Sequence, residues 1–300
     1  MTRSDVTFPA AGGQCAGWLY QPDRPSAAPG TRPIIVMAHG LAGVKEMRLD
    51  AFAERFAAAG YACLVFDYRH FGSSSGTPRQ LLDVGRQLED WEAAIAYART
   101  IEGVDPDRVV LWGTSFGGGH VIVTAASDQR VAAAVAQCPF TDGLASSTAI
   151  PTRTSLRLTV RAIRDVTHML TGREPVTVPA YGPPGSTALM TAPDCEPGVL
   201  SLIPEGTHVS DQVAARFALQ IVRHFPGRSA ENVSCPILFV VCDNDSVAPA
   251  GPTLKYAVRA PRGEIRRYAA GHFDIYVGDA FERNVADQLA FLAHHIPVDQ

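Results

Sequence analysis

Apolar runs that alternate with amphipathic segments constrain the fold of this chain more than any other feature. The runs at 33–40 (PIIVMAHG), 61–68 (YACLVFDY) and 108–113 (RVVLWG) are typical of strands buried on both faces of a parallel sheet. Between them, residues 46–59 and 80–100 have the apolar spacing of helices. Strands that alternate with helices connect through right-handed crossovers, so the pattern predicts a mostly parallel sheet with helices on both faces.

The alternation is interrupted after a predicted strand at 131–138 and resumes with the run CPILFVVC at 235–242. The intervening stretch, 141–234, is too long for a structureless loop in a compact domain. We therefore expect it to form a helical lid over the sheet. Two helical patterns lie in it, at 155–171 and 210–224, together with a segment rich in proline and glycine at 175–206.

The two ends of the chain complete the predicted sheet. A short strand is expected at 14–20, followed by an exposed proline-rich loop at 22–33. After the resumed strand, the patterns predict a helix at 250–260, a strand at 264–268 and a last helix at 279–295. Together with the central alternation, these elements indicate one α/β core.

The composition excludes several classes of protein. Of the 300 residues, 46 % are hydrophobic and 19 % are charged, and the net charge of −4 offers no basic surface for nucleic acid. No stretch reaches the ~18 apolar residues of a membrane span, and none resembles a signal peptide. We therefore expect a cytoplasmic protein without a nucleic-acid or membrane partner. The six cysteines lack ligand-like spacing, so reduced core thiols are expected and no metal site.

The sequence GTSFG at 113–117 matches G-x-S-x-G, between a predicted strand and the apolar helical run GGGHVIVTAA. A serine on this tight turn projects its hydroxyl above the sheet, and side chains at the flanking positions would collide with neighbouring backbone. The helix N-terminus behind the serine favours developing negative charge. The pattern predicts that Ser115 is a nucleophile. An ordinary glycine-rich turn is the structural alternative.

A serine hydroxyl needs a general base at neutral pH. His272, in the sequence GHF, follows the last predicted strand and precedes the final helix, which suits a base in the chain order Ser, acid, His. His294 and His295 are rivals, but they fall in the terminal helix. A histidine in an ordinary surface loop is the structural alternative for His272.

Two carboxylates follow the strand at 235–242, in the sequence CDNDSVAP. The alternation of a strand end places Asp243 and Asp245 on the same side, so geometry does not separate them. Asp245 stands in a DSVAP run that resembles the D-x-V-x-P acid loop of many α/β-hydrolases. We therefore expect Asp245 to fix the tautomer of the imidazole, and Asp243 to cap the following turn or helix.

An acyl-transfer site also needs donors for the oxyanion. The backbone N–H of Phe116, directly after the serine, is the first candidate, and the N–H of Leu41, after His39-Gly40, is the second. Each donor typically contributes about 3 kcal/mol to the transition state. His39 is expected to hold its loop by hydrogen bonds rather than to take part in the reaction.

The motifs HGLAG, DYRHFGSS, GTSFG and GHF, with Asp245, resemble the α/β-hydrolase superfamily over about 30–140 and 235–295. The closer resemblance is to dienelactone-hydrolase-like and Xaa-Pro-peptidase-like hydrolases, including fungal polyketide transferases and thiohydrolases. This closer resemblance depends on four segments: HGLAGVKE, FDYRHFGSSSGTPRQ, WGTSFGGGHV and VVCDNDSVAP. Dienelactone hydrolases proper use a cysteine nucleophile, so their substrate does not transfer to Ser115. Some relatives supply an oxyanion donor from the loop after 61–68, which makes Tyr68 a further candidate, near the pocket rim.

We therefore expect an α/β-hydrolase fold with its core at 1–140 and 235–300 and a lid at 141–234. The expected function is hydrolysis of a carboxylic ester or thioester with an apolar acyl part, without a cofactor or metal. The expected partner is that small molecule, and a homodimer is possible. An acyltransferase, a peptide or amide hydrolase with a charged subsite in the lid, and a non-catalytic ligand receptor are the alternatives. Three lid residues are candidates either for an acyl pocket or for the core of the lid itself: Met169, Leu170 and Phe217.

Overall fold

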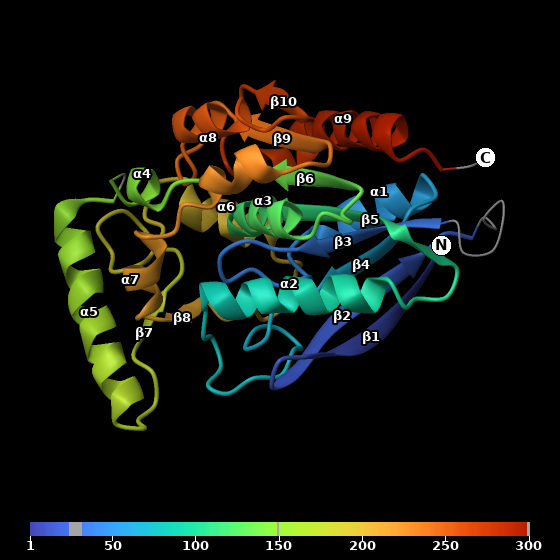
Figure 1. The fold of residues 1–300 in the computed structure, drawn as a ribbon. Helices are drawn as coiled ribbons and strands as arrows, with labels where there is room; N and C mark the ends of the chain where they lie inside the picture. Colours follow the sequence, from blue (N-terminus) through green and yellow to red (C-terminus); the bar gives the residue numbers. More distant parts are fainter. Residues whose placement is uncertain (24–31, 149, 299–300) are drawn as a thin grey trace.

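The computed structural model describes residues 1–23, 32–148 and 150–298. Its main feature is an eight-stranded sheet of order β1-β2-β4-β3-β5-β6-β9-β10 (Figure 1). The β1 and β2 strands are antiparallel additions at one edge, and the pairs from β4 to β10 are all parallel. The mostly parallel sheet is therefore confirmed. The strands are β1 (Thr2–Ala10), β2 (Gly13–Gln21), β3 (Arg32–Ala38), β4 (Ala62–Phe66), β5 (Val104–Thr114), β6 (Ala133–Gln137), β9 (Ile237–Cys242) and β10 (Gly263–Tyr268).

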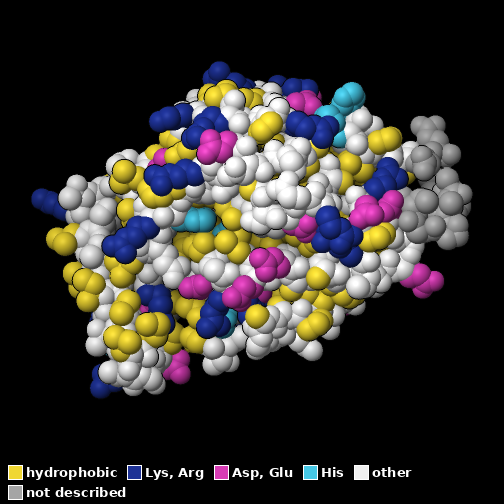
Figure 2. All heavy atoms as spheres, viewed as in Figure 1, with side chains coloured by type: hydrophobic (Ala, Val, Ile, Leu, Met, Phe, Trp, Pro, Cys, Tyr) yellow, Lys and Arg dark blue, Asp and Glu magenta, His cyan; other side chains and the backbone are white. Residues whose placement is uncertain are grey.

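Helices cover both faces of this sheet. The first and last helices, α1 (Leu49–Ala58) and α9 (Gly278–His295), contact each other on one face. On the other face, α2 (Val84–Ala98) packs beside α3 (Phe116–Ser127), and α3 and α8 (Ala250–Ala257) both contact the short 3-10 helix η1 (Pro226–Asn232). Within the described residues, no helix is both long and apolar enough to cross a membrane. Positive and negative side chains are interspersed on the face seen in Figure 2.

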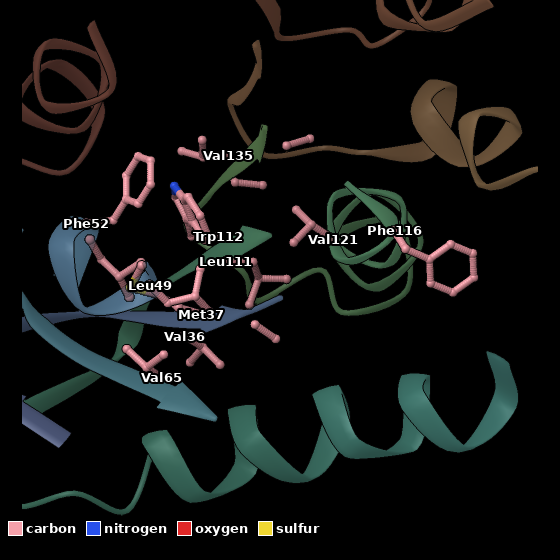
Figure 3. Packing of buried hydrophobic residues seen from close by; sticks show 14 of the residues in the cluster. Val36, Met37, Leu49, Phe52, Val65, Leu111, Trp112, Phe116, Val121 and Val135 are labelled. Atoms are coloured by element: carbon pink, nitrogen blue, oxygen red, sulfur yellow. The ribbon is translucent and has the colours of Figure 1, made fainter. Parts of the chain in front are cut away.

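The core lies on both sides of the central strands, which explains their continuous apolar runs. In Figure 3, Leu49 and Phe52 of α1 lie toward Trp112 of β5, and the rings of Phe52 and Trp112 are 5.0 Å apart. Val121 of α3 packs on the opposite side of β5. Each fully buried side chain of this size contributes roughly 1.5–3 kcal/mol. All six cysteines are buried in this core and unpaired, as expected.

The first hundred residues hold one strand that the sequence patterns did not indicate and one helix that begins later than expected. The strand β1 was not predicted, because most of its residues are exposed and its place depends on pairing with β2. The helix expected at 80–100 begins at Val84, since the carboxylate of Asp83 accepts a hydrogen bond from the N–H of Arg86 at 3.0 Å and caps it. Most of the loop expected at 22–33 lies outside the described residues.

The stretch 141–234 holds the elements between β6 and β9. The helix predicted at 155–171 is confirmed as α5. The helix predicted at 210–224 is wrong, because Val213 pairs with Val178 in a small buried ribbon and only a short helix follows. In Figure 1, α5 stands at the outer end of the molecule. The elements are α4 (Gly143–Thr148), α5 (Thr152–Leu170), β7 (Thr177–Pro179), α6 (Cys195–Leu202), β8 (Gln212–Ala214), α7 (Phe217–Ile221) and η1.

Candidate active site

Ser115 occupies the turn between the end of β5 and the start of α3. Its backbone has φ 56° and ψ −120°, a conformation that side-chain-bearing residues rarely adopt. Three backbone hydrogen bonds hold it. The N–H of Ser115 donates to the carbonyl of Gln137 at 2.8 Å, and its own carbonyl accepts from Gly119 at 3.2 Å and Phe140 at 2.9 Å. The turn is therefore fixed by β6 and by the chain that follows it.

The glycines around Ser115 allow the backbone to approach closely. A Cβ atom on Gly113 would lie 2.3 Å from the carbonyl oxygen of Gly117, and one on Gly117 would lie 2.4 Å from that of His39. A Cβ atom on Gly40 would lie 2.7 Å from Cβ of Ser115. These contacts explain why glycine flanks the serine, and they bring the loop after β3 against the turn.

Two further side chains lie in line with Ser115 at the carboxyl ends of the parallel strands, His272 next to the serine and Asp245 next to His272. The ring nitrogen Nε2 of His272 lies 3.0 Å from Oγ of Ser115, and Nδ1 lies 2.6 Å from Oδ2 of Asp245. The other oxygen of Asp245, Oδ1, accepts the N–H groups of Val247 at 2.8 Å and Ala248 at 2.6 Å. Because the carboxylate accepts from Nδ1–H, Nε2 is left free to accept the serine proton.

The structure separates the two candidate carboxylates. Asp243 turns toward solvent and binds Arg267 of the neighbouring strand β10, with Oδ1 2.8 Å from Nε. The side chain of Asp245 is only 1 % exposed and faces His272. The prediction that both carboxylates lie on the same side is therefore wrong, because the chain turns after β9.

The surroundings of His272 favour its protonated form. Burial is the largest single influence on the pKa of His272 and alone would lower it, but the carboxylate of Asp245 and the nearby Cys138 together outweigh burial and raise this pKa well above the usual 6.5. The loop of His272 is held in place by Asp274, which accepts the N–H of Gly271 at 2.7 Å. The positive charge that develops on the imidazole ring is thus stabilised by Asp245, which Val247 and Ala248 hold in position.

Leu41 borders both cavities together with Ser115, and Phe116 follows Ser115 directly in the chain. Phe116 is the first residue of α3, so its N–H has no acceptor within the helix. Among the hydrogen bonds of the described residues, none uses the N–H of Leu41. His39 holds this loop: its Nδ1 accepts from the N–H of Gly40 at 2.8 Å, and its Nε2–H donates to the carbonyl of Met47 at 3.0 Å. Burial lowers the pKa of His39 to about 4, so this ring is neutral.

Tyr68 does not reach the serine. Its hydroxyl accepts a hydrogen bond from Nε1 of Trp91 at 3.0 Å, and its ring is buried against Phe66 and His120. The prediction that Tyr68 lies near the pocket rim is wrong, because this aromatic cluster draws the side chain into the core. Its neighbour Asp67 braces the loop through Lys45, which donates from Nζ at 2.7 Å.

A buried polar network lies beneath the turn, and no motif in the sequence singles it out. The amide of Gln137 donates to Oγ1 of Thr114 at 3.1 Å and accepts from Asn284 at 2.7 Å and Gln288 at 2.8 Å. Gln288 in turn accepts from Nε1 of Trp112 at 2.7 Å. The sequence feature that could have revealed this network is the presence of polar residues at positions where apolar ones are expected. Gln137 ends the buried strand β6, and Asn284 and Gln288 lie on the buried face of α9.

Two cavities meet at Ser115. The larger holds about 920 Å³ of empty space and the smaller about 520 Å³, in both cases including space open to solvent, and both are bordered by Leu41, Ser115 and Met190. His272 and Phe273 border the smaller cavity, whereas Phe116 borders the larger. Among the described residues, no Asp, Glu, Lys or Arg lines either cavity. Half of the remaining lining of the larger cavity comes from α4, α5, α6 and α7, and residues 189–192 supply a further part.

The three lid residues proposed for an acyl pocket do not line the larger cavity. Met169 and Leu170 lie exposed at the end of α5, so they form neither the pocket nor a core. Phe217 is fully buried and packs its ring edge-on against Phe116, with centroids 5.4 Å apart. It belongs to the packing beneath the cavity.

One group of side chains in the described part of the chain could in principle bind a metal ion. It consists of Cys138, Asp245 and His272, whose potential ligand atoms lie within 4.8 Å of one another. Asp245 and His272 already share a hydrogen bond through the atoms concerned. A metal ion would have to replace that bond, so the donor set does not fit a resident metal.

The sequence model of a family described as serine aminopeptidase, S33, matches residues 29–275. The "Quorum-quenching protein AidA" of Acinetobacter baumannii (strain MDR-ZJ06) is 55 % identical over 294 residues, which cover 98 % of this chain and 95 % of that protein. The "Polyketide transferase grgF" of Penicillium sp. is 31 % identical over 304 residues, covering 99 % and 98 %.

A solved structure extends the comparison to the fold. The crystal structure of α/β hydrolase GrgF from Penicillium sp. sh18 matches with a TM-score of 0.82 at 25 % identity and covers 99 % of both chains. These likenesses confirm the resemblance to α/β-hydrolases and fungal polyketide transferases that the sequence motifs indicated.

Proposed function

Since this chain belongs to the serine aminopeptidase S33 family and has the α/β-hydrolase fold, we propose that it hydrolyses a neutral carboxylic ester or thioester through an acyl-enzyme on Ser115. One observation carries the proposal: Nε2 of His272 lies 3.0 Å from Oγ of Ser115 while Nδ1 lies 2.6 Å from Asp245. A non-catalytic receptor would not require a base and an acid aligned in this way.

The reaction follows from this arrangement. Oγ of Ser115 attacks the carbonyl carbon while Nε2 of His272 takes the hydroxyl proton. The carboxylate of Asp245 stabilises the resulting imidazolium, which then gives its proton to the leaving oxygen or sulfur. Water, deprotonated by His272, attacks the acyl-enzyme in the same way and releases the acid. The N–H groups of Leu41 and Phe116 stabilise both tetrahedral oxyanions.

The two cavities orient the substrate. The leaving group must lie within reach of Nε2 of His272, because this atom protonates it. His272 borders the smaller cavity, so the leaving group occupies that side. The acyl chain then extends into the larger, mostly apolar cavity past Phe116. Leu158, Leu189 and Ile221 are among the residues that line this cavity, and such an apolar lining suits an apolar acyl group.

The lining supports an ester over a peptide. Aminopeptidase activity would need a carboxylate close to the site for the charged amino terminus of the substrate. Neither cavity has such a residue within the described ranges. Ser146 and Ser147 border the larger cavity, and a serine hydroxyl there can bind a neutral polar substituent on the acyl chain.

We also assign residues 141–234 the role of a lid. Its elements supply much of the lining of the larger cavity. It is tied to the acid loop by Ser246, whose Oγ donates to Asp194 at 2.7 Å. It also touches the base loop, since a Cβ atom on Gly198 would lie 2.4 Å from the ring of Phe273.

Acyl transfer is the second candidate, favoured by the relative described as a polyketide transferase. It would use the same acyl-enzyme, with an alcohol or amine in place of water. The name of the 55 % identical relative refers to quorum quenching. Small acylated signalling molecules, including lactones, therefore belong among the substrates to be tested.

The test has two parts. A fluorophosphonate probe should label Ser115, and Ser115→Ala should abolish turnover of p-nitrophenyl esters in a folded protein. Labelling at another residue, or full activity of this variant, would refute the assignment. A panel of esters, thioesters and lactones of increasing acyl length, with and without amine or alcohol acceptors, then separates hydrolysis from transfer.

A further inference from the structure

Helix α5 exposes an apolar stripe on the side opposite its buried face. Leu156, Val160, Ile163 and Leu170 are 66 %, 58 %, 57 % and 77 % exposed. Their spacing of four, three and seven residues places them along one side of the helix. A surface helix normally turns polar residues to solvent, so packing within this chain does not explain the stripe. The buried face consists of Thr154, Leu158, Ala162 and Asp165.

One edge of this stripe is strongly basic. Successive residues of a helix are 100° apart around its axis, so the positions of side chains around α5 follow from the sequence. Measured from Leu156, four exposed arginines of α5 lie about 60–140° away on one side of the stripe. The only acidic residue of α5 is Asp165, which is buried and binds Arg216 at 2.7 Å. The outward surface of α5 is thus apolar and positive, although the chain has a net charge of −4. The arginines are Arg153, Arg157, Arg161 and Arg164.

The other edge of the stripe adjoins the larger cavity. Ser155 and Thr159 border that cavity and lie about 60–100° from Leu156 on the side away from the arginines. Figure 2 shows hydrophobic and basic side chains together at the end of the molecule that α5 forms. A surface that receives the stripe would therefore also lie next to the cavity.

We propose that α5 docks on the surface of an anionic lipid bilayer. The stripe enters the boundary between headgroups and acyl chains, and the arginines bind the lipid phosphates, as in helices that lie in the interfacial plane. A contact between the α5 helices of two copies of this chain complements the arginines poorly, because α5 offers them no exposed carboxylate. The expectation of no membrane partner rested on the lack of a spanning run, a criterion that does not detect an interfacial helix.

Vesicle sedimentation tests this proposal without requiring activity. The protein carries Ser115→Ala, so that lipid is not consumed, and the vesicles are phosphatidylcholine with or without about a quarter phosphatidylglycerol. We expect binding only to the anionic vesicles, weakening as salt is added. Arg161→Gln and Arg164→Gln should each weaken binding roughly fivefold.

Stripe variants and a matched control complete the experiment. Ile163→Gln should remove most of the binding, and Leu156→Ser provides an independent variant should the first fail to fold. Val258→Gln, at an apolar residue 72 % exposed at the end of α8, should bind as the parent does. Absence of binding to anionic vesicles, or equal binding by folded stripe variants, would overturn the proposal. Sedimentation velocity showing a dimer that these variants dissociate would also overturn it, and would make a second copy the partner.

Discussion

The change Asp245→Asn tests how the carboxylate controls the tautomer of His272. An asparagine keeps the shape but has only one accepting oxygen. The N–H groups of Val247 and Ala248 both point at Oδ1, so the amide oxygen is held there and the NH₂ group faces Nδ1. Nδ1 must then accept, which puts the proton on Nε2, where it faces Oγ of Ser115 and cannot take the serine proton.

The structure also sets the size of this effect. Restoring the productive tautomer requires flipping the amide, which turns its NH₂ toward the two N–H groups and leaves both without an acceptor. Each buried donor left unpaired costs about 1–3 kcal/mol. The two donors together cost about 2–6 kcal/mol, so the productive form is populated in about one molecule in 30 to one in 3 × 10⁴, and kcat should fall by that factor.

Steady-state kinetics with p-nitrophenyl butyrate measure this loss, and circular dichroism checks that the variant is folded. Asp243→Asn is the matched control. Its exposed pair with Arg267 contributes little, so kcat should stay within about twofold of the wild type. If Asp245→Asn keeps more than about a tenth of the wild-type kcat, or if Asp243→Asn is the more damaging change, our account of the acid is wrong.

Three other outcomes follow from the site. The base must be neutral and the pKa of His272 is raised, so kcat/KM should increase with pH above 6.5; a profile already level at 6.5 would contradict this. Gln288→Ala leaves Nε1 of Trp112 unpaired and should lower the free energy of unfolding by about 1–3 kcal/mol in urea titrations; an unchanged midpoint would argue against the network. Leu158→Trp should cut kcat/KM for decanoyl esters about tenfold or more and spare acetyl esters. Equal losses would remove the acyl chain from the larger cavity.

The central sheet could be predicted because its information is local. The runs at 33–40, 61–68 and 235–242 are apolar throughout, since helices cover both faces, and they correspond to β3, β4 and β9. Parallel strands bring their carboxyl ends to one edge, so residues after those strands were expected to meet. The structure places Ser115 and His272 there, 3.0 Å apart between Oγ and Nε2.

Side-chain direction at the strand ends could not be predicted in the same way. Asp243 and Asp245 are two residues apart, so a continued strand would place both side chains on the same side. Because the chain turns after β9, Asp243 binds Arg267 and Asp245 binds His272. Tyr68 follows its strand much as a rim residue would. A partner 23 positions away in the sequence, Trp91, draws its hydroxyl into the core instead.

The stretch 141–234 was harder to predict because contacts between residues far apart in the sequence fix it, both within the stretch and with other parts of the chain. Gly143 has no room for a side chain, since a Cβ atom there would lie 1.9 Å from the carbonyl oxygen of Ile221. Asp194 is held by Ser246, which lies beyond β9. None of these restraints leaves a periodic pattern, so helix α5 was visible while the cavity lining was not. The apolar stripe on α5 has the regular spacing of a packed helix face, yet its side chains are exposed in the part of the chain that the structure describes.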